Sequence, residues 1–221
     1  AITPFMPCSM TFFIARGTSL LQHVADIGRR TVVGYLNIER FHAVNDELGY
    51  VRGDELIRHV ADVLKEVFPQ RHLTYITGAQ FGILCYLDEV DEAMRQVNAR
   101  LAQWEPGHPV RALAGFVEYP EGDTLMSLMD DARHAYASIE QDKSYRIYDE
   151  RLDEERRMRQ HIVSSFGRAL SEGWAKVYYQ PIVRASDGKV CALEALSRWD
   201  DPTYGLLPPF RFIGVLEDEG I

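Results

Sequence analysis

Two stretches of the sequence carry side chains that could bind a metal ion or a phosphorylated ligand. The first, residues 37–54, holds Asn37, Glu39, His42, Asn45 and Asp54, and the second, residues 180–198, holds Gln180, Glu194 and Arg198. Carboxylate and amide oxygens are ligands for hard divalent cations, and the planar donor fork of arginine matches a phosphate. Both stretches are therefore candidate sites.

Several of these residues also have a structural interpretation, which their types and spacing leave open. Asp54 stands at the expected start of a helix and could cap it. Asn45 and Asp46 could cap a turn. Glu194 could be a surface carboxylate at the end of a strand, and Arg198 could hold a structural ion pair.

A third stretch, residues 77–81, lies between two apolar runs and predicts the turn of a β-hairpin. Its residues are Thr77, Gly78, Ala79, Gln80 and Phe81. Gly78 supplies the unusual backbone angles that a tight turn requires. The turn holds no charged side chain and no metal ligand, so its residues alone predict an ordinary hairpin.

The composition limits the classes of protein that need to be considered. The chain has 221 residues, 46% of them hydrophobic, which is enough for one large globular domain or two smaller ones. A net charge of −9 disfavours nucleic acid as the main partner. No apolar run reaches the roughly 18 residues of a membrane span, and no secretory signal is recognised at the start, where the sequence looks like a cut into a longer protein. Cys8, Cys85 and Cys191 have no metal-binding spacing, so we expect buried thiols in the cytoplasm.

The apolar periodicity up to residue 148 alternates between helix and strand. Strands are expected at residues 31–38, 73–76, 81–87, 110–119 and 145–148, and helices at 19–27, 39–48, 54–67, 90–104 and 125–139. This order predicts an α/β or α+β sandwich that occupies residues 1–148.

The remainder of the chain differs in character. Residues 149–173 are dense in charges of both signs with a helical apolar stripe, which predicts a long, partly exposed connecting helix. Two strands follow at 177–183 and 189–199, joined by a turn at Ser186, Asp187 and Gly188, and a helix begins behind Pro208 and Pro209. A second domain is therefore expected, with residues 174–221 as its incomplete start.

The first part resembles the GGDEF (diguanylate cyclase) family over roughly residues 15–148. The family pattern is D-x-D-x-F-K at the end of a strand, then N-D-x-x-G-H and G-D-x-x-L, and then the GGDEF hairpin. The first three patterns are matched, in order, by NIERFH (37–42), NDELGY (45–50) and GDEL (53–56). The hairpin motif is replaced by TGAQF (77–81). The resemblance implies the α+β sandwich of the nucleotidyl-cyclase type.

The same resemblance implies that cyclase chemistry has been lost. Family cyclases hold two metal ions with carboxylates at the strand end and in the hairpin. Asn37 and Glu39 occupy the strand-end positions, and Ala79 and Gln80 occupy the hairpin positions. His42 replaces the lysine of the F-K pair, and Ile139 aligns loosely with a lysine that contacts phosphates in the family.

Asn45 and Asp54 match the family positions that hydrogen-bond guanine. A guanine presents donors to a carboxylate and acceptors to an amide, so this pair is chemically suited to the base. Two alternatives stay open: the pair binds GTP as an allosteric ligand without turnover, or it is purely structural.

The second part resembles the opening of an EAL domain, the cyclic di-GMP phosphodiesterase family. The matching segments are YYQPIV (178–183), EALSRW (194–199) and the run from Gly205 to Ile221. The resemblance implies a TIM-like barrel in which Glu194 ligates Mg²⁺ or Mn²⁺ while Gln180, Leu196 and Arg198 contact the substrate. Such a barrel needs about 200 residues or more, so its remaining metal ligands and general base are expected beyond Ile221.

Together the two resemblances predict a bacterial cyclic di-GMP signalling protein with a regulatory first domain and a hydrolytic second one. The alternatives are a receptor that binds cyclic di-GMP without cleaving it and signals through a protein partner, and an inert scaffold. The expected small-molecule partners are cyclic di-GMP and, as the open alternative above, GTP. Homodimer formation is left open.

Overall fold

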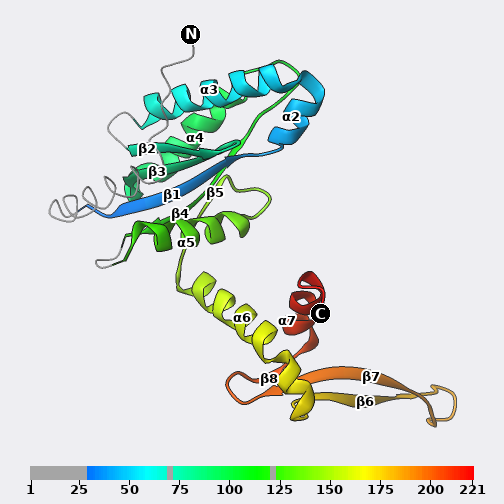
Figure 1. Ribbon diagram of the computed structural model, residues 1–221. Coiled ribbons are helices and arrows are strands. Elements are labelled where there is room, and N and C mark those ends of the chain that lie inside the picture. The colour runs from blue at the N-terminus through cyan, green and yellow to red at the C-terminus, as the bar shows by residue number, and fades with distance from the viewer. Residues whose placement is uncertain (1–28, 69–71, 120–122) are drawn as a thin grey trace. The chain divides into compact units, whose positions relative to one another are not determined.

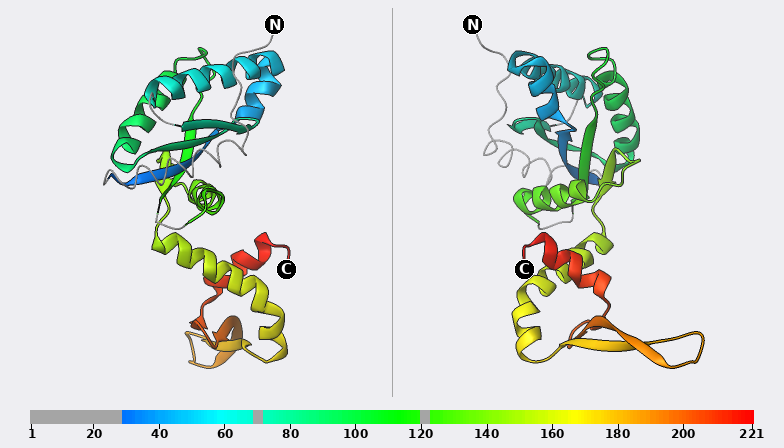
Figure 2. Two further views of the ribbon diagram at one scale, coloured as in Figure 1. Left: turned by 60° about the vertical axis from the view of Figure 1, so that its left-hand side comes forward. Right: turned by 90° about the vertical axis from the view of Figure 1, so that its right-hand side faces the viewer.

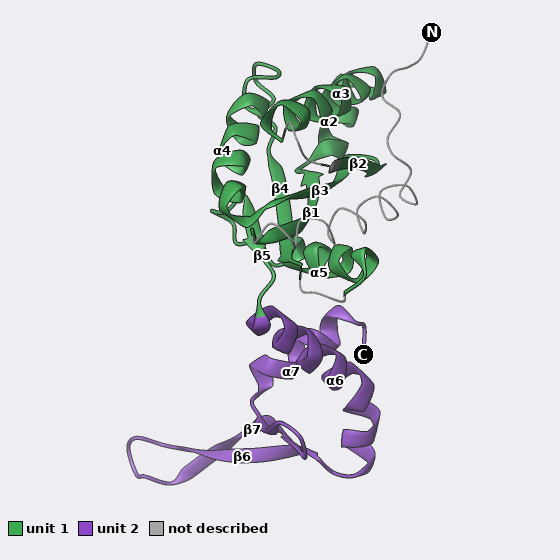
Figure 3. Cartoon of the chain, turned by 90° about the vertical axis from the view of Figure 1, so that its left-hand side faces the viewer, with its two compact units in different colours: residues 1–149 green, residues 150–221 purple. Residues whose placement is uncertain are grey.

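The computed structural model describes residues 29–68, 72–119 and 123–221. The helix expected at 19–27 and Cys8 lie outside these residues. The chain divides into two compact units, unit 1 at residues 1–149 and unit 2 at residues 150–221 (Figure 3).

Unit 1 is built on a five-stranded sheet with the strand order β2-β3-β1-β4-β5. Its strands are β1 (Thr31–Ile38), β2 (His72–Thr77), β3 (Gln80–Tyr86), β4 (Ala112–Glu118) and β5 (Tyr145–Ile147). The central strand β1 pairs antiparallel with β3 and β4, and β4 pairs parallel with β5. The β-branched and apolar run of β1 is almost wholly buried, as its composition predicts.

Helices cover both faces of this sheet (Figures 1 and 2). They are α2 (Phe41–Leu48), α3 (Tyr50–Val67), α4 (Val90–Leu101) and α5 (Leu125–Ala137), with a short 3₁₀ turn, η1 (Leu87–Glu89), before α4. Val32 and Leu36 of β1 belong to the core under α3 and α4, whereas Val33 and Tyr35 belong to the core under α5. Because strand side chains alternate, Asn37 projects on the α5 face.

The expected helix start at residue 54 was wrong. α3 begins at Tyr50, directly after Gly49, whose φ of 84° lets the chain end α2 and enter α3 without a longer linker. Asp54 therefore lies inside α3 and is not its N-cap. Asn45 and Asp46 lie inside α2, so the turn-cap interpretation is wrong too.

Unit 2 contains a long helix, a twisted hairpin and a second helix (Figure 1). Its elements are α6 (Glu150–Ser171), β6 (Ala175–Val183), β7 (Val190–Asp201), β8 (Gly205–Leu207) and α7 (Pro209–Asp218). Ile162 and Ala169 of α6 pack with Trp199, Phe212 and Leu216. Half of the residues of α6 are exposed, but its buried stripe makes it part of the unit 2 core. The short strand β8 was not predicted.

The outer parts of β6 and β7 are exposed on both faces, and Cys191 lies there. Its thiol is exposed, so the expectation of a buried thiol was wrong for this residue, whereas Cys85 is buried in unit 1.

None of the helices in the described ranges is long and apolar enough to cross a membrane.

A buried carboxylate fixes the inner end of β7. Asp201 Oδ2 lies 2.8 Å from His161 Nε2 of α6, and Asp201 Oδ1 accepts from the backbone N–H groups of Thr203 at 2.8 Å and Tyr204 at 3.0 Å. Burial acts to raise the pKa of Asp201, but the hydrogen bonds from His161 and from the two amides outweigh it, and the pKa is lowered from 3.8. The contact joins α6 to the sheet of unit 2.

Candidate nucleotide and metal sites

The hairpin turn at residues 77–81 lies against the end of β1. Asn37 pairs in register with Gln80, and the Ile38 N–H donates to the Ala79 carbonyl over 3.2 Å. Gly78 adopts a φ of 56°, as its place in the turn predicts. The strand-end position and the hairpin positions therefore form one local site.

The side chains at this site are neutral. Asn37 Nδ2 donates to the Tyr136 hydroxyl of α5 over 3.1 Å, and Gln80 shares the face of Asn37 because the two are cross-strand partners. The Ala79 side chain is buried in the unit 1 core and has no ligand atom. Phe81 is buried and packs edge-on against Tyr75, while Thr77 is exposed.

Glu39 is the acidic residue nearest in sequence to Asn37, and it is engaged elsewhere. Its carboxylate lies 3.8 Å from the Arg111 guanidinium, and its N–H donates to the Arg111 carbonyl over 2.8 Å. His42 is exposed in the first turn of α2. Within the part of the chain that the structure describes, no three His, Cys, Asp or Glu side chains gather to hold a metal ion. The residues at 37, 79 and 80 thus do not fit the pair of metal ions that cyclases use.

Asn45 and the turn that carries Asp54 are in close contact. A Cβ added to Gly53 would lie 1.9 Å from Asn45 Oδ1, so the missing side chain of Gly53 leaves the space that the Asn45 amide fills. Asn45 is half-buried in this contact, whereas Asp54, the next residue along α3, is exposed. Asn45 therefore contacts the residue that precedes Asp54, and the Asp54 carboxylate is open to a ligand.

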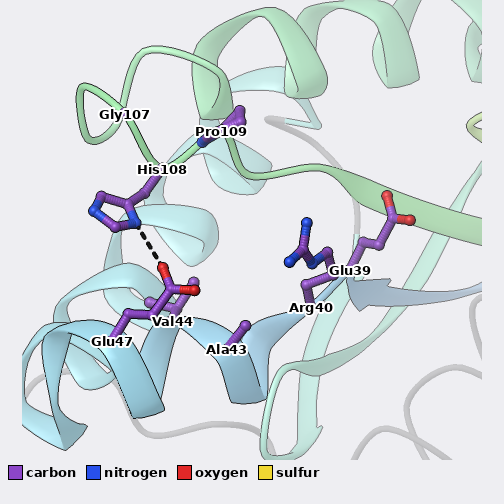
Figure 4. Close-up of a pocket in the computed structure, with 8 residues that line it drawn as sticks. All are labelled: Glu39, Arg40, Ala43, Val44, Glu47, Gly107, His108 and Pro109. Carbon is purple, nitrogen blue, oxygen red and sulfur yellow. Dashed lines mark ion pairs between the residues drawn. The ribbon is translucent and has the colours of Figure 1, made fainter.

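A separate pocket of about 230 Å³ opens between α2 and the loop at residues 107–109 (Figure 4). It is lined by Glu39, Arg40, Ala43, Val44, Glu47, Gly107, His108 and Pro109. His108 Nδ1 lies 3.1 Å from Glu47 Oε2, and Arg40 has a left-handed φ of 57°. The spacing of residues 40, 43, 44 and 47 places the pocket on a different side of α2 from Asn45. No local sequence pattern predicts this pocket, because its two walls are far apart in the chain.

In unit 2, the strand register brings the predicted residues to one face. Gln180 of β6 pairs directly with Glu194 of β7, and Tyr178 pairs with Leu196. Since alternate residues of a strand share a face, Glu194, Leu196 and Arg198 project on the same side as Gln180. Gln180 and Glu194 are exposed, and Leu196 and Arg198 are partly exposed.

The charged groups on this face remain available. Arg198 Nη1 donates to the Ser197 carbonyl over 2.7 Å, and no carboxylate among the described residues pairs with it, so the ion-pair interpretation of Arg198 is not supported. Lys176, directly opposite Arg198, is held 2.9 Å from Asp200, and this hydrogen bond raises the pKa of Lys176. Glu194 makes no hydrogen bond or ion pair with the residues that the structure describes.

A comparison of the sequence with models of protein families identifies the family of unit 1. The family model described as "Diguanylate cyclase, GGDEF domain" matches residues 10–146, more than half of the chain. The chain belongs to the GGDEF family. The model of the EAL domain matches residues 164–221, so the GGDEF domain is followed by EAL sequence.

Curated relatives resemble this chain over most of its length. The cyclic di-GMP phosphodiesterase NbdA of Pseudomonas aeruginosa is 28% identical over 88% of the chain. The bifunctional diguanylate cyclase/cyclic di-GMP phosphodiesterase MucR of the same organism is 28% identical over 87%. The chain spans 26% and 30% of the length of these two proteins.

Solved structures confirm the GGDEF-type fold. The GGEEF domain of a diguanylate cyclase from Vibrio cholerae aligns with a TM-score of 0.58 and 17% identity, covering 66% of this chain and 99% of that one. The GGDEF domain of DgcB from Caulobacter crescentus, in complex with c-di-GMP, aligns with a TM-score of 0.55 and 21% identity, covering 63% of this chain and 90% of that one. The mixed sheet with helices on both faces is therefore the GGDEF α/β fold, and the EAL segment has no closed barrel. The roles of the individual site residues remain predictions.

Proposed function

We propose that the chain is part of a cyclic di-GMP signalling protein in which the GGDEF domain regulates and the complete EAL domain hydrolyses cyclic di-GMP to linear pGpG. The tandem of GGDEF and EAL sequence supports a role in cyclic di-GMP signalling. The observation that carries the assignment of roles is the contrast between the two sites: the GGDEF site has neutral side chains, and the EAL face keeps a free carboxylate.

The neutral site argues against a cyclase. Asn37 and Gln80 cannot neutralise a divalent cation as carboxylates do, and Ala79 contributes no ligand atom. Losing charged ligands beside a triphosphate removes several kcal/mol of transition-state stabilisation, roughly the scale that electrostatic groups supply in other enzymes. We infer that this GGDEF domain does not form cyclic di-GMP from GTP.

The EAL face argues for a hydrolase. Glu194 is exposed and opposite Gln180, and its oxygens are hard donors that suit Mg²⁺ or Mn²⁺. When bound, such a cation would supply Lewis acidity for phosphodiester cleavage, and Glu194 is the residue of this chain that would hold it. Arg198 lies two positions beyond Leu196 on the same face, where its guanidinium can bind a phosphate of the substrate.

The regulatory ligand of the GGDEF domain is proposed to be a guanine nucleotide at Asn45 and Asp54. The contact of Asn45 with Gly53 supports this, because it fixes the amide against the residue that precedes the exposed Asp54. GTP is the ligand that the family resemblance suggests. A purely structural role of the pair is the competing interpretation, and it is weakened because neither residue is a helix cap.

The phosphodiesterase proposal is tested on the complete protein. Incubation with cyclic di-GMP and Mg²⁺ or Mn²⁺ should produce linear pGpG. Retained tight binding without product would instead identify a cyclic di-GMP receptor, the second candidate function. That receptor would not need the free Glu194 carboxylate, which is why the hydrolase is favoured.

A further inference from the structure

The pocket between α2 and the loop at residues 107–109 is lined by neither Asn45 nor the hairpin turn. We infer that it binds a small monocarboxylate, an organic acid with a short apolar body whose carboxylate pairs with Arg40. Its volume of about 230 Å³ lies below the roughly 300–1,000 Å³ of typical ligand pockets, which favours a small ligand. The inference depends neither on the proposed guanine site nor on hydrolysis by the EAL domain.

Arg40 supplies the cation of this pocket. Its φ of 57° is left-handed, a conformation that is uncommon outside glycine and that clusters at binding and catalytic sites. The Arg40 carbonyl accepts from the N–H groups of Ala43 at 2.9 Å and Val44 at 3.3 Å, so the first turn of α2 fixes this backbone. Figure 4 shows the Arg40 side chain rising from the start of α2, with the His108 ring across the pocket from it. The guanidinium is therefore held at the pocket from a fixed point of the backbone.

The other charged groups that line the pocket have partners. Glu47 Oε2 lies 3.1 Å from His108 Nδ1, and the Glu39 carboxylate lies 3.8 Å from Arg111 Nη1. By contrast, the Arg40 guanidinium forms no hydrogen bond or ion pair with the residues that the structure describes. Because a guanidinium carries five N–H donors and no acceptor, an oxyanion is the ligand that satisfies it.

The groups around Arg40 select a monoanion with an apolar body. Glu39 and Glu47 place two carboxylates at the pocket wall. Inorganic phosphate and dicarboxylates carry more negative charge near neutral pH than a monocarboxylate, so they meet more repulsion there. The two oxygens of a planar carboxylate match the Arg40 donor fork in a bidentate pair. Ala43 and Val44 contribute apolar wall, which a short hydrocarbon chain would remove from water.

The test is titration of the ¹⁵N-labelled 221-residue chain with butyrate, succinate and inorganic phosphate, followed by NMR at constant pH and ionic strength. Butyrate should shift the amide signals of Ala43, Gly107 and His108 along saturable curves. Succinate and phosphate should bind at least about threefold more weakly, the scale of interactions between exposed charges.

Two variants examine the cation and the space separately. Arg40→Gln removes the charge and should weaken butyrate binding by about tenfold or more, as expected when a hydrogen bond to a charged group is lost. Ala43→Leu keeps Arg40 but fills the space beside α2, and it should abolish saturable binding. Arg58→Gln, at an exposed arginine of α3 that does not line the pocket, is the matched control and should bind butyrate like the unaltered chain. The amide spectrum of each variant shows whether its fold is retained.

Each contrary result has a definite meaning. An absence of saturable shifts, or shifts confined to amides outside α2 and residues 107–109, would overturn the inference. Equal or tighter binding of phosphate would contradict the choice of a monocarboxylate, and full affinity in Arg40→Gln would contradict the pairing with Arg40. Because these titrations contain no nucleotide, none of these results bears on the proposed guanine site.

Discussion

Asn37 of β1 donates a hydrogen bond from Nδ2 to the hydroxyl of Tyr136 on α5, over 3.1 Å. The bond ties the sheet to α5 at the position where family cyclases place a metal-binding carboxylate. Tyr35, two residues earlier on β1, packs edge-on against the same Tyr136 ring, and burial raises the pKa of Tyr35. Asn37, which the family resemblance aligns with a metal ligand, is thus part of the packing between a strand and a helix.

The acidic ligands should be restorable without loss of the fold. In Asn37→Asp/Gln80→Glu, both changes are nearly isosteric, and the Tyr136 hydroxyl can donate to the new carboxylate at position 37. The free energy of unfolding should change by less than about 1 kcal/mol. Titration with GTP should now show tighter binding with Mg²⁺ than with EDTA, because two hard carboxylate ligands have been added.

Gln103→Glu is the control for this double variant, since it adds charge at an exposed position away from the hairpin. Its GTP affinity should remain independent of Mg²⁺. If the double variant folds and binds guanosine normally but shows no response to Mg²⁺, the hairpin does not face the bound nucleotide, and the assignment of the site is contradicted.

Gly53→Ala should disrupt both stability and guanine binding. The new Cβ would lie 1.9 Å from Asn45 Oδ1, so the amide must rotate away. Overpacking of this kind costs about 1–3 kcal/mol. Chemical denaturation followed by tryptophan fluorescence, in which Trp104 reports on unit 1 and Trp174 and Trp199 on unit 2, measures the loss, and titration with guanosine measures the effect on binding.

A double-mutant cycle separates the contact from the intrinsic effect of alanine in a helix. Asn45→Ala should restore most of the stability lost in Gly53→Ala, because the two side chains then no longer compete for space. The matched control is Gly167→Ala in α6, where an added Cβ meets nothing within 4 Å. This control should stabilise unit 2 by up to about 1 kcal/mol through helix propensity. Equal effects of the two glycine substitutions would show that the Asn45 contact is not present.

Asp201 should give unit 2 a component of stability that acid removes. Its pKa is lowered in the folded state from the ordinary 3.8 because the hydrogen bonds from His161 and two amides outweigh burial. A depressed carboxyl pKa stabilises the folded state fully above 3.8, and this contribution is lost as the pH falls through the lower, folded value. Asp201→Asn should cost about 1–3 kcal/mol at neutral pH, as expected when buried donors lose a charged acceptor.

Hydrogen exchange at the Thr203 and Tyr204 amides measures this effect locally. In Asp201→Asn, both amides should exchange faster at neutral pH, and the difference from the unaltered chain should shrink below pH 3.8. Lys176 and Asp200 form an exposed pair on the neighbouring strands. Asp200→Asn is therefore the control and should leave these amides unchanged. A constant difference at all pH values would show that ionisation of Asp201 does not contribute.

Local patterns predicted the secondary structure well where packing agrees with them. The β-branched run of β1 and the apolar stripe of α4 form the expected elements because their periodicity is also their burial pattern. The start of α3 was missed because Tyr50 and Val51 are helical but exposed, so no apolar stripe marks them. The start of α3 is set instead by the positive φ of Gly49.

For the site residues, the sequence predicts which of them share a face of a strand, but not which residues of other elements they contact. The common face of Glu194, Leu196 and Arg198 follows from a period of two residues, but the pairing of Gln180 with Glu194 depends on the register of the hairpin. The Asn37–Tyr136 bond joins residues 99 apart in sequence, and no local pattern encodes it. The same applies to the contact between Asn45 and the missing side chain of Gly53, which requires the angle between α2 and α3.

The central claim is that the EAL face carrying Glu194 serves hydrolysis of cyclic di-GMP in the complete protein. The most direct measurement is the initial rate of linear pGpG formation by the complete protein, by Glu194→Gln and by the matched surface variant Glu172→Gln, with Mn²⁺ and saturating cyclic di-GMP. We predict product from the unaltered protein and from Glu172→Gln, and a loss of about a hundredfold or more in Glu194→Gln. An unaltered protein that binds cyclic di-GMP but forms no pGpG, or a Glu194→Gln variant with the full rate, would contradict the claim.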